Sequence, residues 1–526
     1  MRLTERNVLF YFPSIGNTIF LVIFLYLCFT GQRLLDDGDT GFHIRAGEFI
    51  IENHIVPKFD IFSFHTPPIP WIAHEWLSEV LMGGVHKYFG LTGVGVLFSF
   101  TIATIFYLLY RFIKGNNGNI LISAVLVILS AFTSYFHWLA RPHIFSILLL
   151  LIWYFILEEY QYRNKRLIYY LPLLMILWVN LHGGFILGFL MISVYFTGNL
   201  IDAFISGGEN KNLAKEKAKR NFSVGIFCLA AAFINPYGYR ILSFPFTLIF
   251  EKSLVNYSNE YLSPNFHHIF FIFFGAYLLF TITIFMTSKK TPTPTEIILV
   301  ILFTYMSLYS CRNIALFSII IAPILFRQIE YLLHEKNTPI FVKFKNKAKK
   351  YNDIDRYSNG FLWPVMGVIL IILATKIGYI NFKFDERMRK PVRAVEFLKG
   401  KPIKGNMFNA DEYGDYIIYS AYPQYKVFID GRIDIYMPEI FGDYQRIANF
   451  ETGWEDIIEK YQIKWIIYDK DSPLSRFLVE RKDWRLIYYD EISNIFVKNI
   501  NEFKSIFKRY HSRTRAKEDG DPRGID

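Results

Sequence analysis

The residues with the clearest potential for chemistry lie in the segment 34–48, directly after the first long apolar run. Three aspartates, Asp36, Asp37 and Asp39, fall within four positions, and His43 follows. On a helix, Asp39 and His43 would share one face, because residues four apart are neighbours there. Carboxylates crowded at a membrane surface repel each other and lose solvation, which raises the pKa of at least one of them. The segment therefore suits a general base or a cation site.

The same segment has other interpretations. It could be a solvated loop in which Asp39 or Thr40 caps a helix that starts near Gly41. The spacing of Asp37 and Asp39 would suit Mg²⁺ or Mn²⁺, both of which prefer carboxylate oxygens. A site that uses no metal fits these residues as well.

The elements that must position these residues are apolar runs. The chain has 526 residues, of which 52% are hydrophobic, and the apolar residues gather in runs of roughly 20, the length that crosses a bilayer. The first run lacks a clear cleavage site and is interpreted as a retained span. Cys28, Cys228 and Cys311 lie in or beside such runs, without zinc-site spacing or a disulfide framework. About eleven candidate spans follow from this pattern: 12–31, 91–113, 119–136, 143–158, 167–182, 184–205, 222–235, 267–287, 294–310, 313–328 and 361–380.

The distribution of basic residues predicts the orientation of the chain. With the N-terminus in the cytoplasm, the cytoplasmic connections are 111–118, 158–167, 206–221, 288–294 and 327–360, and each is basic. Lys and Arg favour cytoplasmic loops. This rule explains the net charge of +11 better than nucleic-acid binding does, so no nucleic-acid partner is expected.

This orientation places the remaining polar motifs on the external side. Ionisable residues at membrane depth are costly and mark functional sites by default. Each could also have a plainer role, as an interfacial anchor for the arginines or as a core or capping residue for the others. The residues concerned are His74, Glu75, Arg141, His143, His182 and Arg312.

Two regions outside the spans are predicted to fold. The first external loop, 32–90, contains an amphipathic helix over 76–88, which lies either at the membrane interface or partly buried at a protein surface. A small external α/β domain follows at 381–500, with strands at 426–430 and 464–469, a helix at 472–481, and a hairpin of 485–489 with 494–498. The charged tail, 501–526, is expected to be disordered.

The small external domain also contains a group of charged residues. We interpret them chiefly as ordinary strand-end and turn residues, with a catalytic role as the alternative. They are Asp411, Glu412, Asp415, Asp430, Arg432 and Asp434.

The chain resembles the GT-C superfamily of integral-membrane glycosyltransferases, which includes oligosaccharyltransferases, protein O-mannosyltransferases and aminoarabinose transferases. The matching pieces are the aspartate segment after the first span, the long loop with Pro57, Asp60 and His74-Glu75-Trp76, and Phe428-Ile429-Asp430-Gly431-Arg432. The resemblance implies a polytopic α-helical GT-C-like membrane domain over 1–380 with an extracytoplasmic α/β domain. It also implies a multi-pass protein of a prokaryotic plasma (inner) membrane.

The resemblance implies transfer of a sugar from a polyprenyl-phosphate donor to a glycan, lipid or protein acceptor, with inversion. Asp39 is then the expected general base, with Asp37 second. Arg141 and Arg312 are expected to bind the lipid phosphate, because a guanidinium can fork onto phosphate oxygens. The remaining expected substrate-binding residues are His43, His74, Glu75, His143 and His182.

Two non-enzymatic functions stay open at this point. A transporter or flippase would need polar residues and broken helices near the bilayer midplane, whereas the polar residues here gather at one end of the spans. An envelope scaffold with a decayed site is the second alternative, and the intact aspartate segment argues against it.

Overall fold

The computed structural model describes residues 10–36, 38–115, 118–250, 260–335, 338–358, 362–386 and 389–504, with side chains omitted for 247–250. The chain forms two compact units. Unit 1 comprises residues 1–34, 74–78 and 85–382, and unit 2 comprises 35–73, 79–84 and 383–526. The first external loop therefore groups largely with the C-terminal residues.

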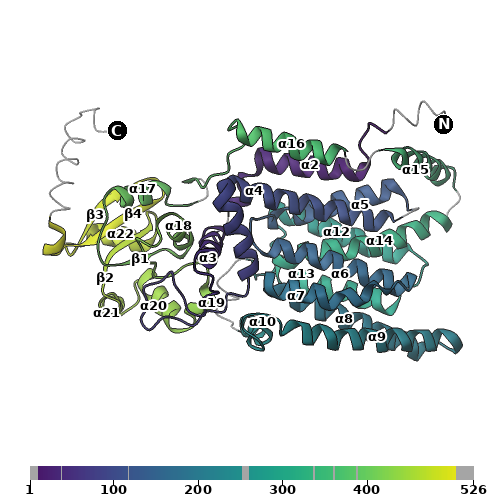
Figure 1. Cartoon of the computed structure of the whole chain (residues 1–526), viewed down its shortest axis with the longest axis horizontal. Coiled ribbons are helices and arrows are strands. Elements are labelled where there is room, and N and C mark those ends of the chain that lie inside the picture. Colours follow the sequence, from purple (N-terminus) through teal and green to yellow (C-terminus); the bar gives the residue numbers. More distant parts are fainter. Residues whose placement is uncertain are drawn as a thin grey trace. The chain divides into compact units, whose positions relative to one another are not determined.

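Unit 1 is built from long helices, most of which run side by side (Figure 1). Sequence signals account for several helix ends. The Asn119 side chain caps one helix, and Thr293, Pro294 and Glu296 form a capping box with proline at the first position of another. The helices are α2 (Ile15–Thr30), α4 (Trp76–Lys114), α5 (Ile120–Ser134), α6 (His143–Arg163), α7 (Leu171–Leu181), α8 (Ile186–Ile205), α9 (Gly208–Ala232), α10 (Arg240–Phe250), α12 (Ile269–Thr287), α13 (Pro294–Tyr309), α14 (Ile314–Glu335), α15 (Pro339–Tyr357) and α16 (Leu362–Lys376).

Helix length and composition support a membrane protein. Among the described residues, seven helices are long and apolar enough to cross a membrane, and three apolar helices are shorter. A helix covers each of the eleven predicted segments, including 222–235, most of which lies in the second half of α9. The first half of α9 is charged. The number of crossings therefore stays a prediction.

The predicted helix at 76–88 begins at Trp76 as expected, and it ends close to the predicted position. The range of α4 runs on to Lys114, but Gly90 is non-helical, with φ at 62° and ψ at −166°. This positive φ is a conformation that glycine adopts without strain. The amphipathic segment and the next span are therefore two helices that meet at Gly90.

Charged side chains tie three helices of unit 1 together away from the polar motifs described below. Arg327 of α14 donates from Nε to Glu296 Oε1 of α13 at 2.7 Å and from Nη1 to Glu158 Oε2 of α6 at 2.5 Å. Tyr195 of α8 donates to Glu158 as well. Buried carboxylates need such partners because they have lost water.

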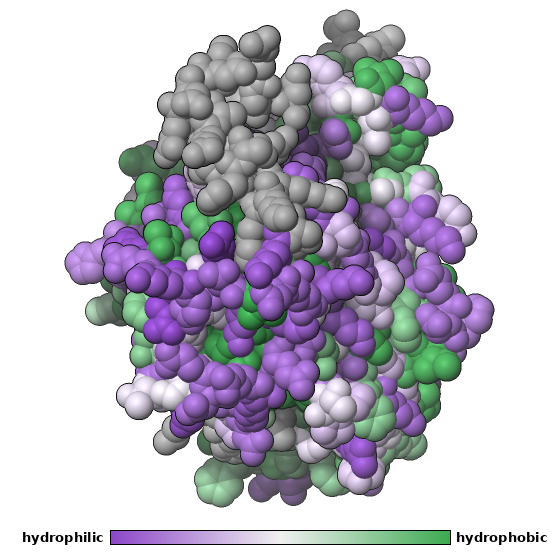
Figure 2. All heavy atoms as spheres, turned by 90° about the vertical axis from the view of Figure 1, so that its left-hand side faces the viewer, coloured by the Kyte–Doolittle hydropathy of each residue, from purple (hydrophilic) through white to green (hydrophobic). Residues whose placement is uncertain are grey.

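Unit 2 contains a four-stranded mixed sheet with the order β1-β2-β4-β3. The strands are β1 (Asn406–Asn409), β2 (Ile463–Asp469), β3 (Trp484–Tyr489) and β4 (Ser493–Lys498). β1 pairs parallel with β2, and the other pairs are antiparallel. The helices of this unit are α3 (Thr40–Asn53), α17 (Val392–Gly400), α18 (Asp411–Ala421), α19 (Ile433–Tyr436), α20 (Glu439–Ala448), α21 (Trp454–Lys460) and α22 (Pro473–Glu480). The face in Figure 2 is mostly hydrophilic, as expected for a surface in water.

Most of the predicted elements of the α/β domain are confirmed. β2 lies at the predicted strand 464–469, and α22 lies at the predicted helix, with Ser472 as its cap and Pro473 at its first position. The predicted hairpin is formed by β3 and β4. The expected disorder of the tail falls almost wholly outside the described residues, which end at residue 504.

The predicted strand at 426–430 is wrong, and β1 was not predicted. The segment is buried, but its backbone groups bond to loops and side chains instead of a sheet. Val427 N–H donates to Phe62 O, Phe428 N–H donates to Asn409 Oδ1, and the Asn409 amide donates to Ile429 O. These partners satisfy the buried backbone without a strand ladder.

Candidate functional site

Asp39 lies at the start of α3 in unit 2, at the position that the capping interpretation predicts. It occupies the N-cap position of α3, but its side chain makes no capping hydrogen bond. α3 packs tightly on α18 at Gly41. A Cβ on this residue would lie 2.5 Å from the backbone oxygen of Asp415, so there is no room for a side chain. This close approach brings the start of α3 to a residue far away in the sequence.

A group of carboxyl side chains surrounds Gly431. A Cβ on Gly431 would meet Asp39 Oδ1 at 2.4 Å and Asp415 Oδ2 at 2.9 Å, so both carboxyl groups lie against the same glycine. The Gly431 N–H donates to the Asp415 carboxyl at 3.2 Å. Burial raises the pKa of Asp415 well above its usual value, and the charges of Asp39 and Asp430 raise it further. The arrangement thus places a buried acid of raised pKa beside Asp39.

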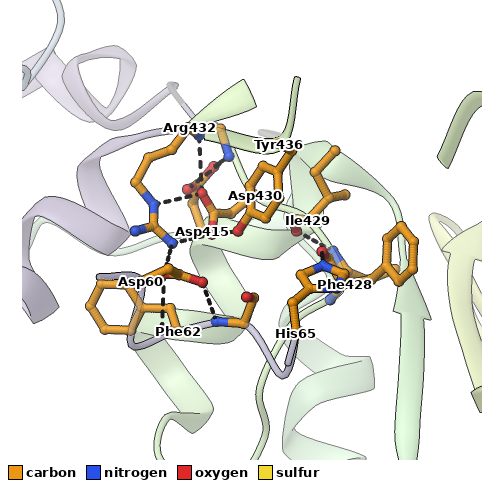
Figure 3. Close-up of polar contacts among 12 residues, drawn as sticks. Asp60, Phe62, His65, Asp415, Phe428, Ile429, Asp430, Arg432 and Tyr436 are labelled. Carbon is orange, nitrogen blue, oxygen red and sulfur yellow. Dashed lines mark hydrogen bonds and ion pairs between the residues drawn. The ribbon is translucent and has the colours of Figure 1, made fainter. Parts of the chain in front are cut away.

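A buried arginine holds the loop beside Gly431 in place (Figure 3). Arg432 donates from Nε to Asp430 Oδ1 at 2.8 Å and from Nη2 to Asp430 Oδ2 at 2.6 Å. Its Nη2 also donates to Asp60 Oδ1 at 2.7 Å, and Tyr436 donates its hydroxyl proton to Asp430 Oδ2 at 2.7 Å. The guanidinium lies 4.6 Å from the centre of the Trp71 ring, a cation–π distance.

Electrostatics in this network follow from burial and from Arg432. Burial raises the pKa of Asp60, but the charge of Arg432 and hydrogen bonds from Ser63, Phe62 and Arg432 outweigh it, and the pKa is lowered. Burial raises the pKa of Asp434 to about 6, although Arg432 opposes this change. Arg432 therefore keeps its direct carboxylate partner Asp60 ionised.

The other predicted residues of this segment have different outcomes. His43 is buried in α3, its Nδ1 lies 3.3 Å from Glu79 Oε1, and its ring lies 4.0 Å from that of Phe42. Asp37, the second candidate base, lies outside the described residues. Of the two aspartates predicted to bind a metal, only Asp39 lies within the described residues. Metal binding by the pair therefore stays a prediction.

Unit 1 brings a second group of predicted residues together, which we call the His182 relay. Trp178 Nε1–H donates to Ser146 Oγ at 2.7 Å, and Ser146 Oγ lies 2.9 Å from His182 Nδ1. His182 Nε2 lies 3.2 Å from Glu75 Oε1, and His74 Nε2 lies 3.8 Å from the same oxygen. The sequence predicted His74, Glu75 and His182, whereas it gave no signal for Ser146 or Trp178, which look like ordinary span residues.

The two predicted phosphate-binding arginines of unit 1 share one neighbouring segment. Arg141 Nη1 lies 3.2 Å from Glu260 Oε1, and the Arg312 guanidinium lies 4.8 Å from the centre of the Tyr261 ring. The backbone N–H of Arg312 donates to the backbone oxygen of Glu260 at 3.2 Å. The charge of Arg141 lowers the pKa of Glu260, against burial and with help from Arg312. Two cations thus share one carboxylate.

His143 lies in the same unit, but its side chain is already used. It is buried, and its Nε2 bonds to the backbone oxygen of His137 at 3.0 Å. This bond supports the turn before α6. The contact agrees better with the capping interpretation than with substrate binding.

No known family model matches the chain, and no curated protein matches it. Among solved structures, it is similar to the Archaeoglobus fulgidus oligosaccharyltransferase in the apo form, with a TM-score of 0.54 and 12% identity over 86% of this chain and 69% of that one. The same protein in complex with an inhibitory peptide and a dolichol-phosphate, named AglB, gives a TM-score of 0.55 with the same identity and coverage. ArnT from Cupriavidus metallidurans, bound to undecaprenyl phosphate, gives a TM-score of 0.49 and 10% identity over 92% of this chain and 98% of that one. The similarity to the oligosaccharyltransferase shows that the chain has a GT-C-like fold, in a polytopic helical protein with a small C-terminal sheet domain.

Proposed function

We propose that this protein is a membrane glycosyltransferase that moves a sugar from a polyprenyl-phosphate donor to an extracytoplasmic acceptor, with inversion. The observation that carries the proposal is the position of Asp39 on a GT-C-like fold. It follows the first span, it does not cap α3, and its carboxyl group lies against Gly431 beside Asp415. A carboxylate in such a position can take the proton of an attacking hydroxyl or amine.

The proposed reaction needs one base and one anion-binding group. The acceptor hydroxyl or amine attacks the anomeric carbon while its proton passes to the Asp39 carboxylate. The bond from that carbon to the donor phosphate oxygen breaks, and the lipid phosphate leaves with the bonding electrons. Attack from the face opposite the phosphate inverts the configuration, and no covalent intermediate with the enzyme forms.

Arg141 and Arg312 are proposed to bind the lipid phosphate. They place two positive charges beside the single carboxylate of Glu260, so this group keeps one net positive charge. A phosphate oxygen can accept hydrogen bonds from a guanidinium that already contacts a carboxylate, because each guanidinium has five N–H donors. The dolichol-phosphate in the AglB complex supports the proposal that this chain binds a lipid of the same chemical class.

The test is sugar transfer by the purified protein in lipid nanodiscs, from a panel of polyprenyl-phosphate sugars to glycan, lipid and peptide acceptors. Asp39→Asn should reduce the rate by about 10²–10⁴-fold, the usual contribution of a general base. Asp471→Asn, an exposed aspartate after β2, is the matched control and should keep the parental rate. If Asp39→Asn keeps full turnover and Asp37→Asn does not, the base is Asp37. If both keep it, the proposed mechanism is wrong.

A further inference from the structure

The His182 relay joins four polar side chains from separate parts of unit 1. Ser146 lies in α6 and Trp178 lies in α7, both buried, while His182 follows α7 and Glu75 precedes α4. The side chains of Glu75 and His182 are 13% and 15% exposed. The relay therefore runs from the buried interior to a carboxylate that a ligand could reach.

The direction of each hydrogen bond follows from the donors available. An indole nitrogen can only donate, so Trp178 donates to Ser146 Oγ. Ser146 is then free to give its own hydroxyl proton to His182 Nδ1. The backbone N–H of Gly184 also donates to Nδ1, at 2.7 Å. A ring nitrogen that accepts two donors carries no proton, so the proton of neutral His182 must be on Nε2.

A carboxylate lies beside that nitrogen. His182 Nε2 is 3.2 Å from Glu75 Oε1, an ion-pair distance. An N–H group this close attracts the carboxylate and limits the positions that it can take. Beside it, His74 packs against Phe244 with ring centres 4.3 Å apart, which adds a flat apolar surface next to the acceptor. A fixed carboxylate beside such rings suits a polyhydroxylated ligand, because its oxygens accept from hydroxyl groups while the rings cover C–H surfaces.

We propose that Trp178 and Ser146 are positioning residues that fix His182 as the Nε2–H tautomer, and that His182 in turn holds Glu75 as an oriented acceptor for hydroxyl groups of the donor sugar. The identity of the ligand rests on the proposed function. The proton arrangement of the relay does not, so the two can be tested separately.

The kinetic test uses two replacements of His182 that mimic different ring nitrogens. The amide nitrogen of glutamine can reach the position of Nε2, whereas asparagine reaches only that of Nδ1. His182→Gln should therefore keep most of the affinity for the sugar donor. His182→Asn should raise the KM of the sugar donor about 10-fold or more, because Glu75 loses the N–H group that His182 places beside it. Equal KM values in the two variants, or a lower value for asparagine, would overturn the proposal.

A serine pair tests the outer part of the relay. Ser146→Ala removes the acceptor of the Trp178 N–H and one donor to His182, so it should raise the donor KM several-fold with a smaller change in kcat. Ser123→Ala in α5 is the matched control, because among the described residues that buried hydroxyl bonds only to the carbonyl of Asn119. Equal effects of the two variants would exclude a specific role for Ser146.

The tautomer itself can be measured without any transfer assay. In the full-length protein labelled with ¹⁵N-histidine, the His182 signals are assigned by their loss in His182→Gln. Solid-state NMR should show a protonated Nε2 and an unprotonated Nδ1 from pH 6 to pH 8. A protonated Nδ1 in this range would contradict the relay. If the parent protein transfers no sugar, the proposed function fails, and this measurement alone decides the arrangement of protons.

Discussion

Replacing Arg432 by methionine tests the reasoning about unit 2 most directly. The change removes the two hydrogen bonds to Asp430 and the one to Asp60, all between 2.6 and 2.8 Å. Both carboxylates are buried and would stay behind without their cation. Breaking a buried ion pair from one side typically costs about 3–5 kcal/mol. Since each 1.4 kcal/mol is a factor of ten, we expect the equilibrium constant for opening this region to rise about 100- to 5,000-fold.

Hydrogen exchange followed by mass spectrometry can measure this change in the full-length protein in nanodiscs. Peptides covering 58–65 and 427–436 should lose protection by that factor, while peptides from the helices of unit 1 keep theirs. Arg432→Lys should fall between, because lysine keeps the charge but loses the planar fork. Arg476→Met, an exposed arginine of α22, is the control and should change stability by at most about 0.5 kcal/mol.

Two further results would decide whether the cost comes from the charges left behind. Adding Asp60→Asn and Asp430→Asn to Arg432→Met should recover part of the protection, because no unpaired carboxylate then remains. If the triple variant is less protected than Arg432→Met alone, the orphaned charges are not the cause. An Arg432→Met protein with the protection of the Arg476→Met control would refute the role of the network altogether.

The same network predicts a response to acid. The pKa of Asp60 is lower in the folded state than the ordinary value of about 3.9. A carboxyl group with a depressed folded pKa contributes stability above its unfolded value, and this contribution is lost as the pH falls through the folded value. Protection of peptide 58–65 should therefore fall as the pH drops below about 4, and Asp60→Asn should flatten this dependence.

Three other predictions follow from the structure. Asp415→Asn should stabilise unit 2 more at pH 8 than at pH 4. The pKa of Asp415 is raised in the folded protein, so ionisation of this carboxyl group costs the parent protein stability as the pH rises. Equal gains in hydrogen-exchange protection at the two pH values would contradict this. Arg141→Lys and Arg312→Lys should each weaken binding of a polyprenyl phosphate in a titration, because lysine cannot fork onto phosphate; unchanged affinity in both would mean that these arginines are interfacial anchors. The three native cysteines are buried, so cysteines in place of the exposed Lys349 and Lys482 can be labelled selectively. A cysteine at 349 should be labelled only from the cytoplasm, and one at 482 only from outside. Labelling of both from the same side would overturn the orientation.

The local sequence was sufficient for most helices and for the hairpin. Apolar runs of bilayer length indicate the long helices of unit 1, because a buried backbone in lipid must satisfy its hydrogen bonds within the segment. Ser472 and Pro473 mark the start of α22, since both the cap and the fixed φ of proline act on adjacent residues. The helix α3 was also predictable. The sequence could not show that the Asp39 side chain makes no capping hydrogen bond to it.

The strand predicted at 426–430 failed for a reason that sequence patterns do not contain. A short buried apolar run looks the same in a sheet and in a loop. Here the side chain of Asn409 supplies the hydrogen bonds that a neighbouring strand would have given to Phe428 and Ile429. The partners that decide between strand and loop are therefore the Asn409 amide, 19 and 20 residues away, and the carbonyl of the distant Phe62.

Residue types alone marked Asp39, Glu75 and His182 as candidates, because carboxylates and histidines beside apolar runs are costly to keep there. Only the tertiary structure decided what surrounds them. Asp60 and Arg432 are separated by 372 residues and form a buried ion pair. Ser146 became a candidate only because the fold places its hydroxyl 2.9 Å from His182 Nδ1. Hydrogen bonds and ion pairs act over about 3 Å in space, whatever the distance along the chain, so their partners become known only once the chain has folded.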